Sequence, residues 1–244
     1  MIKEINSIEI VSGEFSPLLP RIFMALKYKS GSDNVWQQVD ENGKTTALLS
    51  SVDNNFTLIT TEKTDFEEIT EFVKFSGFNS ILSDVPLKAE QSTSFSLFKY
   101  FGCDREISQD DFVELTDKST LNEYKEFHSL IFEGRKSDFE NWYCDFSKRI
   151  VKNDAKAVAL KKEKLISVAT VPMIYKNIAV ISGVFTSEKF RNKGYSQKTI
   201  NALIKILKSL NVTEIFLWCE ESLELFYQKI GFQKTGNVYI ETEL

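Results

Sequence analysis

The pattern of hydrophobic and polar positions is most regular in the second half of the chain. Two stretches, 119–133 and 138–152, carry hydrophobic residues at helical spacing, and Asp138 is placed to cap the second helix. Three β-rich runs joined by short polar turns follow at 155–160, 165–174 and 178–185. This order predicts a pair of helices followed by an antiparallel meander.

Toward the end of the chain the hydrophobic pattern predicts further helices and strands. A hydrophobic stripe predicts a helix over 197–210. It is followed by a buried-type strand at 213–219 and a short helix at 221–230, which Gly231 ends. Residues 232–244 are predicted to form two short strands with a turn at Gly236 and Asn237. These helices and strands together predict an α/β fold class, with a mixed, mostly antiparallel sheet flanked by helices.

The first half follows a related order. Strands are predicted at 35–39, 45–52 and 56–61, a helix at 65–76 ended by Gly77, and a strand at 79–82. This β-β-β-α-β order is the same as that of residues 155–219, although sequence identity is negligible. We therefore expect two domains, an accessory one at 1–112 and a second one at 113–244, with the boundary near the polar run 106–111.

Composition excludes several kinds of protein. The chain has 244 residues with one histidine, His128, and three cysteines that form no CxxC pair. These counts leave little room for a histidine metal site, a zinc cluster or a disulfide framework, and we expect no metal. No run of hydrophobic residues is long enough for a membrane span, and the N-terminal residues lack the pattern of a signal peptide. We expect a cytoplasmic protein that does not bind a membrane.

Charge is unevenly distributed along the chain. The net charge of the whole chain is −5, but residues 1–114 hold 19 acidic and 10 basic residues, whereas the stretch 145–210 holds 14 basic and 4 acidic residues. A local basic field in an acidic protein is typical of a site for a small anionic ligand. The simplest interpretation of Lys161, Lys162 and Lys164 is nonetheless a solvated turn.

The segment at 184–196, VFTSEKFRNKGYS, lies between a predicted strand and a predicted helix. Gly194 allows the backbone to bend and approach a ligand closely. The first amides of the following helix have no acceptors within the helix, and the helix dipole is positive there. With Arg191 and Lys193 beside them, these amides predict a phosphate or pyrophosphate ligand.

Two motifs resemble those of the GCN5-related N-acetyltransferase (GNAT) family. The segment 191–196, RNKGYS, resembles the family signature R/Q-x-x-G-x-G/A, and 225–232, LFYQKIGF, resembles its C-terminal motif. They stand in the family's order, and the resemblance covers about 113–244. It implies a GNAT fold, with the first half as a degenerate second unit that lacks the signature.

The resemblance implies acetyl-CoA as the donor substrate. Backbone groups of one strand would pair with the pantetheine arm, loop amides would hold the pyrophosphate, and two basic side chains would assist by charge. These residues are Val184, Phe185, Thr186, Arg191, Asn192, Lys193, Gly194, Tyr195 and Ser196. A backbone N–H near Val184 or Phe185 would polarise the thioester carbonyl. Tyr227 matches the tyrosine that serves many family members as general acid to the leaving thiolate.

The sequence departs from the family pattern at two positions. Ser196 replaces a glycine or alanine, although serine is small and can also cap a helix. Glu220 stands where the family often has asparagine. The general base is not identified: Glu220 is better interpreted as a solvated carboxylate at a helix start, and His128 as a packing residue.

These features predict an N-acetyltransferase that acts on a primary amine of a small molecule or protein, by direct attack in a ternary complex. The acidic first half suits a cationic acceptor. Two alternatives remain: a non-catalytic acyl-CoA-binding module, and an aminoacyl-tRNA-dependent transferase of related fold. The acidic net charge and the lack of a basic arm argue against nucleic acid, and a homodimer is left open.

Overall fold

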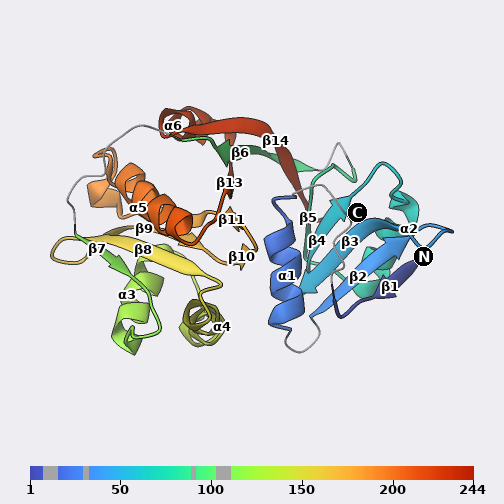
Figure 1. Cartoon of the computed structure of the whole chain (residues 1–244), viewed down its shortest axis with the longest axis horizontal. Helices are drawn as coiled ribbons and strands as arrows, with labels where there is room; N and C mark the ends of the chain where they lie inside the picture. Colours follow the sequence, from blue (N-terminus) through green and yellow to red (C-terminus); the bar gives the residue numbers. More distant parts are fainter. Residues whose placement is uncertain (8–15, 30–32, 89–91, 103–110) are drawn as a thin grey trace. The chain divides into compact units, whose positions relative to one another are not determined.

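The computed structural model describes residues 1–7, 16–29, 33–88, 92–102 and 111–244. The chain divides into two compact units (Figure 1). Unit 1 comprises Met1–Lys99 and Trp218–Leu244, and unit 2 comprises Tyr100–Leu217. Residues 106–110 of the polar run, where the sequence predicts a boundary, lie outside the described residues, so that boundary stays a prediction.

Unit 1 is built on a sheet with the strand order β1-β2-β3-β4-β5-β14-β6. Its elements are β1 (Ile2–Glu4), α1 (Leu19–Lys27), β2 (Asn34–Val39), β3 (Thr45–Val52), β4 (Asn55–Thr60), α2 (Phe66–Ser76), β5 (Ser80–Ser83), β6 (Thr93–Tyr100, whose last residue belongs to unit 2), α6 (Glu224–Lys229) and β14 (Phe232–Glu241). Strands β4 and β5 run parallel, while β14 runs antiparallel to β5. The last strand of the chain therefore lies inside the sheet of the N-terminal unit.

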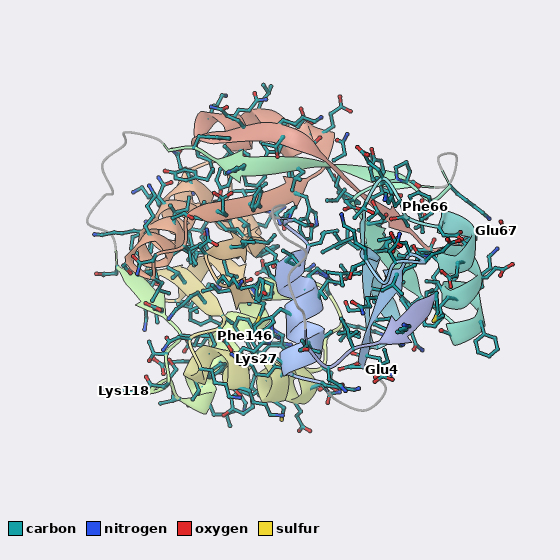
Figure 2. All side chains as sticks on the ribbon, turned by 45° about the vertical axis from the view of Figure 1, so that its right-hand side comes forward. Glu4, Lys27, Phe66, Glu67, Lys118 and Phe146 are labelled. Atoms are coloured by element: carbon teal, nitrogen blue, oxygen red, sulfur yellow. The ribbon has the colours of Figure 1, made fainter. Side chains whose placement is uncertain are left out.

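Helices α1 and α2 cover opposite faces of this sheet (Figure 1). On the α2 face, Ile69 and Val73 pack with Leu58 and Ile81 in a buried cluster. The Asp65 carboxylate caps α2 by accepting hydrogen bonds from the amides of Glu67 and Glu68. Figure 2 shows Phe66 and Glu67 projecting from this first turn to the outside of the unit.

Unit 2 contains the predicted helix pair and meander. Its elements are β7 (Phe112–Glu114), α3 (Leu121–Ile131), α4 (Phe139–Val151), β8 (Lys156–Lys161), β9 (Leu165–Val171), β10 (Ile174–Tyr175), β11 (Ile178–Val180), β12 (Ser182–Thr186), α5 (Tyr195–Ser209) and β13 (Glu214–Cys219), whose last two residues belong to unit 1. Four strands form an antiparallel sheet in the order β12-β9-β8-β7. Strand β11 pairs antiparallel with β10 and parallel with β13.

Helix α5 packs on one face of the four-stranded sheet, and α3 and α4 lie on the other (Figure 1). Helix α3 begins at a capping box in which Thr120 and Glu123 each accept from the other's backbone N–H. Helix α4 begins at Asp138, which accepts from the amides of Glu140 and Asn141. Their inner faces bury Phe127 and Phe146 against the sheet. The predicted cap of α4 at Asp138 is thus confirmed.

The strand predicted over 178–185 is wrong as one continuous element, because the chain changes partner within it. Residues Ile178–Val180 pair with β13, and the Ile181 amide still donates to the Phe216 carbonyl at 2.8 Å. From Ser182 onward the chain pairs with β9, with an irregular register between Ser182 and Phe185. Gly183 lies in this irregular segment with φ +57°, and a Cβ there would come 2.7 Å from Thr170 Oγ1. Glycine is therefore required where the strand bends.

The predicted pair of strands at 232–244 is also wrong, because β14 runs unbroken through Gly236 and Asn237. A tight hairpin turn needs positive φ at its central residues. Neither of these two residues adopts positive φ. The chain therefore continues as one strand of ten residues.

Candidate functional site

The candidate donor site starts at β12, which is an edge strand of its sheet. After Ile181 the chain leaves β13, and β12 pairs on one side only, with β9. Val184 and Phe185 are half-buried and Thr186 is buried, where its hydroxyl contacts Ser167 Oγ at 2.9 Å. An edge strand presents backbone groups that can hydrogen-bond an extended ligand.

The signature loop connects β12 to the N-terminus of α5. Gly194 precedes the helix with φ +76°, and Asn192 also has a positive φ of 60°. Among the described residues, no side chain caps the first amides of α5, and no heavy atom would lie within 4 Å of a Cβ at Gly194. The loop is therefore open around free amides at the positive end of a 15-residue helix, which fits a pyrophosphate.

Ser196 does not cap this helix. It lies within the first turn, because α5 begins at Tyr195 and Gly194 takes the N-cap position. The expectation that Ser196 could cap the helix is thus wrong. A hydroxyl there is small enough to leave the amides uncovered.

The two predicted basic residues have different contacts. Arg191 Nε donates to the Thr186 carbonyl at 3.1 Å, and its guanidinium lies 5.4 Å from the centre of the Phe185 ring. Arg191 thus fastens the loop to the end of β12. Lys193 Nζ donates to the Lys189 carbonyl at 3.2 Å and remains exposed at the loop.

The structure brings a third basic residue, Lys162, to the signature loop, although its sequence suggests only a solvated turn. Lys162 Nζ donates to the Tyr195 phenol oxygen at 2.7 Å, although the lysine is exposed. This bond, followed by the nearby charges of Lys162, Lys193 and Lys198, lowers the pKa of Tyr195. The two partners are 33 positions apart. The β8–β9 turn and the signature loop lie at the same end of the four-stranded sheet, so the contact follows from strand pairing and not from the local sequence.

Tyr227 belongs to unit 1, on α6, whereas the signature loop belongs to unit 2. Its ring is buried, with ring centres 6.5 Å from Phe98 and 6.0 Å from Phe232. Burial is the main cause that raises the pKa of Tyr227 to about 12. Burial also raises the pKa of the neighbouring Cys219 thiol to about 11, so both groups are protonated at neutral pH.

The two candidate bases occupy the settings that the sequence suggested. His128 packs against Phe132 and Trp142, and its Nε2 lies 3.1 Å from Ser137 Oγ. Burial lowers the pKa of His128, only partly opposed by Asp138. Glu220 is exposed directly after β13. Neither residue is marked out as a base.

Unit 1 contains the same strand–helix–strand order, but its strand is paired on both sides and its helix N-terminus is capped. Strand β4 stays paired with both β3 and β5 and does not change partner. At the N-terminus of α2, the Asp65 carboxylate already accepts from the first amides. An anionic ligand would find these amides occupied and a negative charge beside them, so the N-terminus of α2 does not offer an equivalent pyrophosphate site.

Within the described ranges, no group of three or more His, Cys, Asp or Glu side chains is arranged to hold a metal ion. Cys144 and Cys219 are free thiols, and Cys103 lies outside those ranges. Over the same residues, no helix combines the length and the apolar character needed to cross a membrane.

Comparison with known families agrees with this arrangement. Residues 118–232 match the model of the Acetyltransferase (GNAT) family. The chain contains a GNAT domain. This matched segment includes the change of pairing partner between β11 and β12, which we call the strand switch, together with the signature loop and Tyr227. A comparison with curated proteins finds no significant match.

Solved structures share the fold of the GNAT domain and of the rest of the chain. A putative GNAT acetyltransferase from Novosphingobium aromaticivorans aligns with a TM-score of 0.60 at 13% identity, over 93% of this chain and 97% of that one. A GNAT-family acetyltransferase from Colwellia psychrerythraea gives 0.57 at 12% identity, over 100% of both chains. A tandem GNAT protein from the clavulanic acid biosynthesis pathway gives 0.56 at 9% identity, over 87% and 84%. These likenesses concern the fold, and the last supports a tandem arrangement.

Proposed function

We propose that the protein is an acetyl-CoA-dependent N-acetyltransferase that acts on a primary amine. The observation that carries this proposal is the change of pairing partner after Ile181, from β13 to β9, which leaves β12 as an edge strand leading into an uncapped helix N-terminus. An extended amide-containing arm attached to a pyrophosphate matches these two features in order. The GNAT domain match supports the same donor.

The donor would be held mainly by backbone groups. Val184, Phe185 and Thr186 on β12 would hydrogen-bond the pantetheine arm. The amides from Asn192 to Ser196 would bind the pyrophosphate, with the helix dipole adding to the attraction. Lys193 would add charge, while Arg191 would both add charge and keep the loop in place through Thr186.

Bound acetyl-CoA would supply an activated thioester to the acceptor. The amine nitrogen would form the new C–N bond as the C–S bond breaks, so the acetyl group passes directly between substrates. A backbone N–H near Val184 or Phe185 would donate to the thioester carbonyl oxygen as negative charge develops there. Tyr227, protonated because of its burial, would donate to the departing sulfur.

The acceptor is proposed to be cationic before it reacts. The first 114 residues carry 19 acidic and 10 basic residues, which favours the approach of a positively charged molecule. An amine must lose a proton to attack, so the reaction rate would rise with pH near the pKa of the bound amine.

A thiol-release assay with a panel of primary amines tests the proposal. We expect at least one amine to release coenzyme A well above the rate of hydrolysis without amine, together with an N-acetylated product by mass spectrometry. If acetyl-CoA binds but the panel is not acetylated, the protein is a non-catalytic acyl-CoA-binding module. Turnover with aminoacyl-tRNA in place of acetyl-CoA would contradict the donor assignment.

A further inference from the structure

A group of lysine side chains surrounds one phenol beside the signature loop. Lys162 Nζ lies 2.7 Å from the Tyr195 hydroxyl and 4.8 Å from the ring centre, and Lys198 Nζ lies 6.0 Å from the same ring centre. Lys193 follows the same loop and contributes to the positive field at the phenol. These residues come from the β8–β9 turn, the loop and the first turn of α5.

Two lysines of this group, Lys162 and Lys193, have no carboxylate partner among the described residues. Gathering ammonium groups around one site is unfavourable unless an anion offsets their repulsion. The lowered pKa of Tyr195 has the same origin, since the lysines favour negative charge at this position. The arrangement is therefore suited to an anionic group.

The group is separate from the amides that would bind the pyrophosphate, because it is built from side chains. In coenzyme A, a phosphate monoester on the ribose 3′ oxygen is held one sugar ring away from the pyrophosphate. A group that recognises this phosphate must therefore lie next to the pyrophosphate loop. Tyr195 meets this condition, since it directly follows Gly194 and begins α5.

We propose that Lys162 and Tyr195 bind the 3′-phosphate of coenzyme A, with Lys193 and Lys198 adding to the local positive charge. This inference rests on the proposed function, because it concerns the same donor. Lys162 donates one N–H to the phenol oxygen, so the phenol keeps its own O–H as a donor to a phosphate oxygen. The two remaining Lys162 protons are free to form charge-assisted hydrogen bonds with the phosphate. A protein with this site distinguishes coenzyme A from its 3′-dephospho form.

Isothermal titration with coenzyme A and with 3′-dephospho-coenzyme A tests this inference without requiring turnover. We expect the wild type to bind coenzyme A about tenfold more tightly, which corresponds to about 1.4 kcal/mol. In Lys162→Gln this preference should fall to about twofold or less. Lys205→Gln serves as the matched control, because it removes the same charge from an exposed position farther along α5 and should keep the full preference.

The outcomes separate the two proposals. Equal binding of both ligands by the wild type overturns the inference and leaves the proposed donor intact. A preference that survives in Lys162→Gln also overturns it, because the 3′-phosphate would then be recognised elsewhere. If neither ligand binds the wild type, the proposed function itself fails. A glutamine at position 162 can still hydrogen-bond the phenol, and an unchanged melting temperature confirms that the variant is folded.

Discussion

Among single residues, Tyr227 has the setting of a proton donor, although a weak one. Burial raises its pKa to about 12, whereas a free thiol has a pKa of about 8.5. Complete proton transfer to a thiolate is thus uphill by between about three and four pKa units. The phenol would act chiefly by donating a hydrogen bond to sulfur as the C–S bond breaks. Its ionisation would not lower the rate between about pH 7 and pH 10.

Replacing Tyr227 by phenylalanine should lower kcat about 10- to 100-fold, because the departing sulfur loses its donor. The affinity for acetyl-CoA should change little, since backbone groups hold the donor. Steady-state kinetics and calorimetry on Tyr227→Phe measure the two effects. Tyr124→Phe is the matched control: that phenol is also buried with a pKa raised to about 12, and it should leave kcat unchanged. Equal kcat in Tyr227→Phe and wild type would remove Tyr227 from the mechanism.

Site residues could be predicted from the sequence where their role depends on neighbouring residues, and could not where it depends on contacts with distant segments. Gly194 could be predicted from its position between a strand and a helix, and its positive φ agrees. Arg191 could be predicted as a basic loop residue, but its bond to the Thr186 carbonyl could not. The contact between Lys162 and Tyr195 joins two segments that only the folded sheet brings together. Periodicity contains no information about such a contact.

Among the elements, helix starts were predictable because their signals are contained in a few residues. Asp138 accepts the amide hydrogen bonds that its position predicts. The division of residues 178–185 into β11 and β12 was not predictable, because it depends on pairing with β13 on one side and β9 on the other. Helix α1 and strand β6 were not predicted either. Strand β14 lies between β5 and β6, far from both in sequence.

The strand switch depends on Gly183, so Gly183→Ala should destabilise the protein by about 1–3 kcal/mol. The new methyl group would meet Thr170 Oγ1 at 2.7 Å, and alanine disfavours the φ of +57° at this position. Denaturant unfolding followed by circular dichroism measures the change. Gly236→Ala is the control, because that glycine has an ordinary φ and open surroundings among the described residues. Similar stabilities of the two variants would show that the bend does not need glycine.

At the scale of the whole molecule, two units share one order of elements but differ where a donor would bind. Unit 2 has an edge strand and an uncapped helix, whereas unit 1 has a fully paired β4 and a helix capped by Asp65. The sequence predicted the shared order and the missing signature in the first half. It could not show that the amides of α2 are already occupied. We therefore predict a single donor site for each chain.

Calorimetric titration of the full-length protein with acetyl-CoA tests the central claim most directly. We predict one binding site per chain in the wild type and loss of binding in Gly194→Asp, which places a carboxylate among the loop amides. Gly43→Asp is the matched control, since Gly43 has the same φ of +76° and equally open surroundings in unit 1, and it should bind like the wild type. Two sites per chain, no binding by the wild type, or undiminished binding by Gly194→Asp would contradict the account.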